Sequence, residues 1–243
     1  MIQRIRSAAF SVFLFLFVVS MGALCAPAML LGRDATRAVA KLWSRLALQG
    51  LALLAGVRYR VEGAEHIPSG GALIAANHQS MWETIALYLL APKPVMIFKK
   101  ELARIPIYGW WAHAAGNIAI DRKGGAKALR AMARDAKAHV EAGEQIIIFP
   151  EGTRVKPGET ANLLSGVAGV YAAANAPCVP AVHDSGKHWR HPGHEKIPGT
   201  ITLRFLPAIA PNLDRKVFLR ELKARFDSER PDLAPVNEVE RVA

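Results

Sequence analysis

The chain has little cysteine, with two residues in 243. Two thiols cannot form a disulfide framework, and both are typical of buried thiols: Cys25 lies in an apolar run and Cys178 precedes a predicted strand. The sequence has no Gly-x-Ser-x-Gly segment, which argues against a hydrolase with a nucleophile elbow. It also has no internal repeat. With 243 residues and 51% apolar content, one α/β domain with a good core is expected.

Charge is missing between Arg6 and Arg33, and residues 10–19 are almost wholly aromatic or branched aliphatic. About 20 apolar residues cross a hydrocarbon core of about 30 Å, so we expect a membrane-embedding helix here, which Pro27 can bend. The alternative is a secretory signal peptide that is cleaved near residue 28. Basic residues flank the run on both sides and leave its orientation open.

A basic amphipathic helix is predicted over residues 36–56. Arg37, Lys41 and Arg45 recur every fourth position, and leucines form an apolar surface beside them. Such a helix lies well in an anionic membrane interface. The alternative is a helix that packs on the core and leaves its basic face in solvent. In either case we interpret residues 1–56 as a membrane anchor.

Acidic residues are scarce relative to basic ones, 20 against 31, which gives a formal net charge of +11. The excess favours anionic partners: a membrane surface, coenzyme A, acyl carrier protein or nucleic acid. No nucleic-acid recognition module is present and the N-terminus is apolar, so nucleic acid is the weakest of these partners.

Short strand patterns alternate with helical ones after residue 56, which predicts a mixed sheet flanked by helices over residues 57–230. The expected strands are at 57–61, 73–76, 95–98, 118–120, 145–149, near 179 and at 201–206. The expected helices begin after residue 80, after 125, near 167 and after 214. We expect the tail, residues 231–243, to be disordered.

The segment 77–83 follows an apolar strand pattern and holds one imidazole and one carboxylate five residues apart, His78 and Glu83. On a continuous helix, at about 100° per residue, these side chains point to different faces. The chain must therefore turn between them for Glu83 to orient His78 as a base. The alternative is a capping box, in which Glu83 only closes the helix start with Ser80.

A second polar segment, Phe149-Pro150-Glu151-Gly152-Thr153-Arg154, follows the strand pattern 145–149. Pro150 cannot continue the strand inside a sheet, so residues 151–154 lie at its carboxyl end, where ligands of open α/β sheets bind. Arg154 offers a planar donor fork suited to phosphate, and Gly152 permits close backbone approach. The alternative is a surface turn with a solvated arginine.

The two segments, in this order and about seventy residues apart, resemble the glycerolipid acyltransferases, whose first motif is usually written N-H-x-S-x-x-D and whose third is F-P-E-G-T-R. Residues 99–122 are similar to the second motif of that family and residues 179–182 to its fourth. The resemblance covers about residues 57–210. Within the family the chain is similar to the bacterial 1-acylglycerol-3-phosphate acyltransferases, which make phosphatidic acid.

This resemblance implies transfer of a fatty acyl group from an acyl-CoA or acyl-carrier-protein thioester, as co-substrate and without a cofactor, to lysophosphatidic acid. It implies His78 as general base, Glu83 as its orienting carboxylate and Arg154 as the ligand of the acceptor phosphate. The implied substrate-binding residues are Lys99, Lys100, Gly116, Glu151, Gly152, Thr153 and Arg154, with the lysines and the backbone near Gly116 or Gly152 beside the oxyanion. It also implies an inner membrane enzyme whose catalytic domain faces the cytoplasm.

Two departures keep alternatives open. Glu83 is one methylene longer than the aspartate of the family motif, and we interpret it as a tolerated variant. Relatives usually carry Phe-Lys-x-Gly where this chain has residues 163–166, Leu-Leu-Ser-Gly, so a basic residue is missing. An acyltransferase for another lysolipid, such as a lyso-ornithine lipid, therefore stays possible. A non-catalytic membrane adaptor would not need His78 and Glu83 together.

His188, His191 and His194 recur every third residue near Asp184, and imidazoles with a nearby carboxylate are candidate metal ligands. The intervening Pro-Gly pair at 192–193 interrupts any helix that would align them. We therefore predict a solvated basic loop and no metal.

Overall fold

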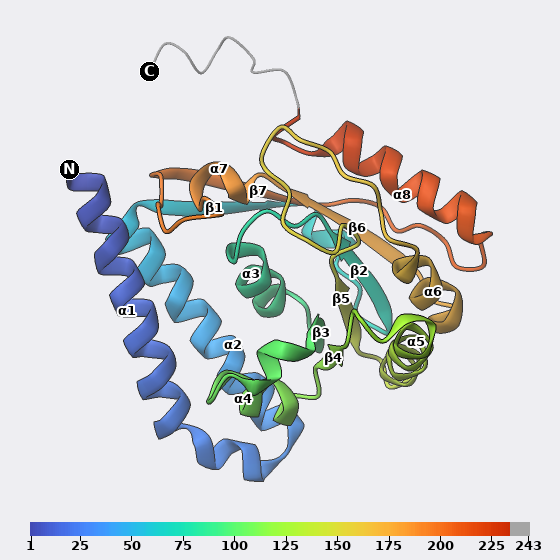
Figure 1. Cartoon of the computed structure of the whole chain (residues 1–243), viewed down its shortest axis with the longest axis horizontal. Helices are drawn as coiled ribbons and strands as arrows, with labels where there is room; N and C mark the ends of the chain where they lie inside the picture. Colours follow the sequence, from blue (N-terminus) through green and yellow to red (C-terminus); the bar gives the residue numbers. More distant parts are fainter. Residues whose placement is uncertain (234–243) are drawn as a thin grey trace.

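The computed structural model describes residues 1–233 and contains one seven-stranded sheet with the order β1-β7-β6-β2-β5-β3-β4 (Figure 1). The strands are β1 Val57–Glu62, β2 Ala72–Ala76, β3 Pro94–Lys99, β4 Ile118–Ile120, β5 Gln145–Ile148, β6 Cys178–His183 and β7 Gly199–Phe205. Neighbouring strands are parallel except for β6 and β7, which are antiparallel. The predicted mixed sheet is therefore confirmed.

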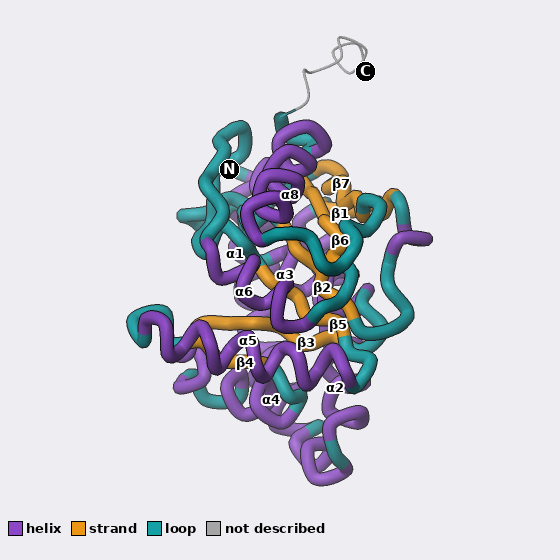
Figure 2. Tube along the Cα trace, turned by 90° about the vertical axis from the view of Figure 1, so that its right-hand side faces the viewer, coloured by secondary structure: helices purple, strands orange, loops and turns teal. Residues whose placement is uncertain are grey.

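Helices cover both faces of the sheet. They are α1 Ile2–Leu24, α2 Arg33–Gly50, α3 Trp82–Leu90, α4 Tyr108–Ala114, α5 Gly125–Glu141, α6 Ser165–Ala174, α7 Ser185–His188 and α8 Arg215–Glu229. Side chains of α1, α2 and α3 pack on one face, and side chains of α5, α6 and α8 pack on the other (Figure 1). Figure 2 shows helices on both sides of the strands.

Alternate residues of a central strand enter the two cores. In β2, Ile74 packs in the core under α1, α2 and α3, whereas Leu73 and Ala75 pack in the core under α5, α6 and α8. A strand buried on both faces reads as a continuous apolar run, which is the pattern of residues 72–76. Because β2, β3, β4, β5 and β6 are parallel to one another, their carboxyl ends lie at the same edge of the sheet.

The N-terminal segment folds as a hairpin of α1 and α2 (Figure 1). Pro27 lies at the start of a 3₁₀ turn, Ala26–Leu31, that separates the two helices, and α2 continues into a π turn, Leu51–Ala55. Both arms are long and apolar enough to cross a membrane by length and composition. However, α1 also buries Ser7, Phe10 and Leu14 against the rest of the chain, so it is part of the packed fold.

The basic stripe on α2 differs from its prediction. Arg37 is only 4% exposed, and its guanidinium lies 2.6 Å from Glu144 and donates to the carbonyl oxygen of Ala115. Lys41 is half-buried and donates to the carbonyl oxygen of Pro92, and Arg45 is the exposed member of the set. The stripe is therefore not a uniform face for an anionic interface, because its first cation is used in a buried ion pair with the loop before β5.

The C-terminal end of the described chain contacts the sheet edge. Pro231 to Leu233, which begin the segment predicted to be disordered, form a turn, and Asp232 accepts a hydrogen bond from the Arg230 guanidinium at 2.7 Å. The rest of that predicted disordered tail, residues 234–243, lies outside the described residues.

Candidate active site

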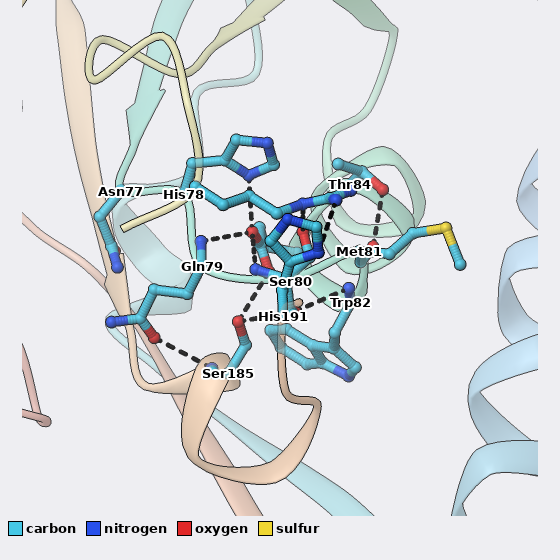
Figure 3. A network of polar contacts seen from close by, with 12 residues as sticks. Asn77, His78, Gln79, Ser80, Met81, Trp82, Thr84, Ser185 and His191 are labelled. Atoms are coloured by element: carbon cyan, nitrogen blue, oxygen red, sulfur yellow. Dashed lines mark hydrogen bonds and ion pairs between the residues drawn. The ribbon is translucent and has the colours of Figure 1, made fainter. Parts of the chain in front are cut away.

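The segment between β2 and α3, residues 77–81, forms a turn at the carboxyl edge of the sheet, called here the histidine turn (Figure 3). Asn77 fixes its start. The Asn77 amide donates to the carbonyl oxygen of His183 at 3.0 Å and accepts the N–H of His183 at 2.9 Å. His183 also donates from Nε2 to the carbonyl oxygen of Asn77 at 2.7 Å. The turn is therefore locked to the end of β6, the strand next to β2.

The turn brings His78 and Glu83 together. His78 Nδ1 lies 2.7 Å from Glu83 Oε1, and the exposed fractions of the two side chains are 15% and 0%. The chain reverses between them, as the five-residue spacing requires. A buried carboxylate at Nδ1 fixes the ring and leaves Nε2 as the nitrogen that can face a substrate.

Glu83 also accepts backbone N–H groups before α3, so it acts both as the carboxylate that orients His78 and as a cap of the helix. Its Oε1 accepts the backbone N–H groups of Gln79 and Ser80, both at 2.8 Å. The Ser80 hydroxyl in turn accepts the N–H of Trp82 at 3.0 Å. Ser80 and Glu83 thus satisfy N–H groups at the start of α3, much as a capping box does, and the carboxylate involved is the one that holds His78.

Two serine hydroxyls complete the surroundings of Glu83. The hydroxyls of Ser80 and Ser185 both donate to Glu83 Oε2 at 2.7 Å. Burial alone would raise the pKa of Glu83, but the neighbouring His183 and His78 and the Ser185 hydroxyl hold that pKa well below its usual range. Glu83 is therefore a carboxylate, and it accepts from five donors.

The segment 149–154 wraps around the histidine turn. The Phe149 ring stacks on the His78 ring with centroids 4.3 Å apart. Glu151 Oε2 accepts the backbone N–H of His78 at 2.7 Å, and the N–H of Val155 donates to the His78 carbonyl oxygen at 2.7 Å. Burial raises the pKa of Glu151 to about 7. Because Glu151 is buried and holds the His78 backbone, its position is that of a support for the turn.

A salt-bridged pair behind Glu151 comes from the end of the described chain. Arg230, which is almost fully buried, lies 3.7 Å from Glu151 and 2.7 Å from Asp232. Asp232 also accepts from the Gln79 side chain at 2.8 Å and from the Gly158 N–H at 2.9 Å. Arg230 and Asp232, called here the C-terminal clasp, thus brace both polar segments.

Arg154 lies beside the histidine turn. Its Nε donates to the carbonyl oxygen of Ser80 at 3.1 Å, and its Nη1 donates to His191 Nδ1 at 3.2 Å. Thr153 is exposed next to it. Gly152 has φ of +70°, and a Cβ there would lie 2.3 Å from the Leu164 side chain, so this turn requires glycine.

Lys99, Lys100 and Gly116 are farther from His78. Lys99, the last residue of β3, pairs with Glu101 at 3.9 Å, and Lys100 pairs with Asp121, just after β4, at 3.6 Å. Within residues 1–233, no hydrogen bond or ion pair joins the three to the histidine turn. The N–H groups of Gly116 and Gly152 donate to the carbonyl oxygens of His113 and Phe149, so neither is free for an oxyanion.

The three loop histidines do not converge. His188 contacts the carbonyl oxygen of Ile197, His191 contacts Arg154, and Asp184 accepts the N–H of Thr202. In the part of the chain that the structure describes, no group of three or more His, Cys, Asp or Glu side chains could hold a metal ion.

Sequence reasoning did not single out Ser185, Arg230, Asp232 or the contact of His191 with Arg154. For Ser185 a signal existed, because it follows the strand block 179–182 directly, and polar residues after a parallel strand reach the same edge. Arg230 and Asp232 carry no such signal, since they follow a helix with a highly charged sequence and no strand pattern precedes them directly.

Comparisons with known proteins identify the family of the chain. The acyltransferase family model matches residues 58–184, just over half of the chain. A 1-acyl-sn-glycerol-3-phosphate acyltransferase of Pseudomonas aeruginosa is 33% identical over 192 residues, which cover 79% of this chain and 75% of that one. The 1-acyl-sn-glycerol-3-phosphate acyltransferase alpha of Mus musculus is 29% identical over 68% of this chain and 60% of its own length.

The fold has a solved counterpart as well. A crystal structure of the 1-acyl-sn-glycerophosphate acyltransferase of Thermotoga maritima has a TM-score of 0.73, covering 92% of this chain and 94% of that one. At 21% identity, the likeness concerns the fold alone. With the family match and the Pseudomonas relative, the chain belongs to the acyltransferase family, among relatives that bear the name 1-acyl-sn-glycerol-3-phosphate acyltransferase.

Proposed function

We propose that this protein transfers a fatty acyl group from an acyl thioester to the sn-2 hydroxyl of 1-acylglycerol-3-phosphate and so makes phosphatidic acid. The observation that carries the proposal is the 2.7 Å contact between His78 Nδ1 and Glu83 Oε1. An imidazole that donates from Nδ1 to a carboxylate presents a lone pair at Nε2. That lone pair can accept the proton of an acceptor hydroxyl.

The reaction is a direct transfer. As His78 Nε2 removes the proton, the hydroxyl oxygen attacks the thioester carbonyl carbon and forms a tetrahedral intermediate. The intermediate collapses as its carbon–sulfur bond breaks, and the thiolate takes the proton from the imidazolium. The negative charge of Glu83 stabilises the imidazolium between these two steps.

Oxyanion stabilisation is proposed to come from the cationic side chains at the same sheet edge. Lys99, the last residue of β3, and Lys100, which follows it, are exposed, and long ammonium side chains can reorient toward a bound thioester. The N–H groups of Gly116 and Gly152 do not take this role in the proposal, because both already donate within their own turns.

The acceptor phosphate is proposed to bind Arg154. Its Nε donates to the Ser80 carbonyl oxygen, so the guanidinium has a fixed position beside the histidine turn that carries His78. A planar fork in a fixed place suits the bidentate binding of phosphate. We place Thr153, exposed beside it, in the same acceptor site.

A panel of lysolipids, assayed with acyl-CoA and with acyl carrier protein thioesters, tests the function. We expect phosphatidic acid from 1-acylglycerol-3-phosphate, and no product from His78→Ala with an unchanged melting temperature. Product only from another acceptor, such as a lyso-ornithine lipid, would overturn the acceptor assignment. Full activity of folded His78→Ala would overturn the mechanism.

Arg154→Lys separates the two substrates. Loss of a charge-assisted bond of about 1.5 to 3 kcal/mol corresponds to a rise of about 10- to 150-fold in the KM for the lysolipid. The KM for the thioester should change little. A change in the thioester constant alone would assign Arg154 to the coenzyme or carrier site.

We propose that the domain faces the cytoplasm at the inner membrane, because thioesters of coenzyme A and acyl carrier protein are cytoplasmic. Support for a lipid-facing surface comes from large apolar side chains that stay exposed on the helical hairpin: Leu24, Leu30, Leu31 and Leu53. Intact-mass measurement of membrane-extracted protein should give a chain that keeps its N-terminal helix. A mature N-terminus near Met29 would contradict the proposal.

A further inference from the structure

The loop after α7 forms a hairpin whose tip reaches the candidate active site. Trp189 and Lys196 form an antiparallel bridge, and the N–H of Arg190 donates to the carbonyl oxygen of Glu195 at 3.1 Å. Residues 191–194 form the tip between them. We call residues 189–196 the histidine hairpin.

The base of the histidine hairpin is fixed to α1. Lys196 is 2% exposed, its N–H donates to the Ser7 hydroxyl at 2.9 Å, and its Nζ donates to the Ser11 hydroxyl at 3.0 Å. The ammonium lies 4.8 Å from the Trp189 ring centroid and 5.5 Å from that of Phe10. Because the two ends of the histidine hairpin make these buried contacts with α1, its tip is held in a defined position.

At the tip, His191 contacts the guanidinium to which we assign the acceptor phosphate. His191 Nδ1 accepts from Arg154 Nη1 at 3.2 Å, while Arg154 Nε donates to Ser80 on the histidine turn at 3.1 Å. Figure 3 places the His191 ring beside Ser80. Two side chains from segments 37 positions apart thus meet next to His78.

We propose that His191 is a specificity-determining residue that binds the phosphomonoester of the acceptor together with Arg154. The inference rests on the proposed function. A phosphomonoester carries a charge of about −1.5 to −2 at pH 7, so one guanidinium neutralises only part of it. The His191 imidazole, which lies next to the Arg154 guanidinium, supplies a second donor to the anion and, once protonated, a second positive charge.

The electrostatics of the free protein fit this role. Burial and the Arg154 cation lower the pKa of His191, and His78 acts in the same direction while Glu83 opposes it. The adjacent Arg190 is paired with Glu195 at 3.4 Å. His191 is therefore largely neutral before the acceptor binds, and a bound dianion draws a proton onto it. Because binding takes up a proton, the affinity for the acceptor should fall as pH rises above 7, where the phosphate is already a dianion.

The test compares His191→Ala with His194→Ala on the full-length protein in detergent–lipid micelles. Both histidines are exposed at the same tip, but the side chain of His194 has no hydrogen-bond partner among the described residues. We expect His191→Ala to raise the KM for 1-acylglycerol-3-phosphate about 10-fold and to leave the thioester KM unchanged. His194→Ala should match the wild type in both constants.

A permanent cation provides the second readout. His191→Lys should keep the low KM for the acceptor at pH 7 and abolish its rise between pH 7 and 8.5. Selectivity for a phosphomonoester over a phosphodiester lysolipid should fall in His191→Ala and persist in His191→Lys.

Equal acceptor constants for His191→Ala and His194→Ala would overturn the inference alone, because the proposed function then still holds. A change confined to the thioester KM would also overturn it. Failure of the wild type to acylate 1-acylglycerol-3-phosphate would overturn the proposed function and the inference with it.

Discussion

Replacement of Glu83 by glutamine isolates the charge of the buried carboxylate. The amide oxygen can take the place of Oε1 and keep its bonds from His78, Gln79 and Ser80. The amide nitrogen can take the place of Oε2, because the Ser80 and Ser185 hydroxyls there can rotate to accept. Glu83→Gln therefore keeps the shape of the site and removes one negative charge.

The expected loss follows from the imidazolium that forms in the reaction. With charge centres about 4 Å apart and an effective dielectric constant of about 20, a carboxylate and an imidazolium attract by about 4 kcal/mol. Neutral His78 feels little of this attraction before the proton moves, so most of it lowers the barrier. The amide dipole retains part of it, and we expect turnover to fall by about 10² to 10³.

The assay is steady-state turnover with 1-acylglycerol-3-phosphate and an acyl thioester, accompanied by thermal melting. Ser185→Ala is the matched control, since it removes one donor to Glu83 without removing charge and should cost less than about 10-fold. Glu83→Asp keeps the charge at shorter reach and should be more active than Glu83→Gln. If folded Glu83→Gln turned over within about threefold of the wild type, the role of this carboxylate would be refuted.

Arg230→Met removes the cation beside Glu151 and should further raise the pKa of Glu151, which burial already raises to about 7, so that Glu151 becomes a weaker acceptor for the His78 N–H. The acid limb of the pH–rate profile should then move to higher pH. Glu229→Gln, at the last residue of α8 and next to Arg230, should leave the acid limb in place. Burial lowers the pKa of Lys196 to about 8 from 10.5, so unfolding titrations should show wild-type stability increasing from pH 8 to 10.5 and Lys196→Met showing no such increase. Leu53→Glu, at a side chain 81% exposed, should reduce co-sedimentation with phosphatidylglycerol vesicles and leave the melting temperature unchanged.

Much of the sheet and the contact between the two polar segments could be predicted from local pattern. The five-residue spacing of His78 and Glu83 predicts a turn between them if the two side chains are to meet, and Pro150 predicts that the preceding strand ends there. Both features depend only on neighbouring residues. Parallel strands then bring the two segments to one edge, as β2 and β5 do here.

The supporting contacts could not be predicted because they join distant parts of the chain. Ser185 reaches Glu83 only because β6 lies beside β2, which the sequence order does not reveal. Likewise, a row of cations at every fourth position looks the same whether it meets solvent or a partner. Arg37 is buried because Glu144, more than a hundred positions away, lies opposite it.

The attachment of Lys196 to α1 decides how this protein can be shortened for work in solution. A chain that starts at Val57 would lose Ser7, Phe10 and Ser11, which are the partners on α1 of the Lys196 ammonium and the Trp189 ring. Removing residues 1–56 would therefore release the histidine hairpin, which carries His191. Polar replacement of outward-facing residues of α1, such as Phe15 and Leu16, preserves that attachment while reducing the exposed apolar surface.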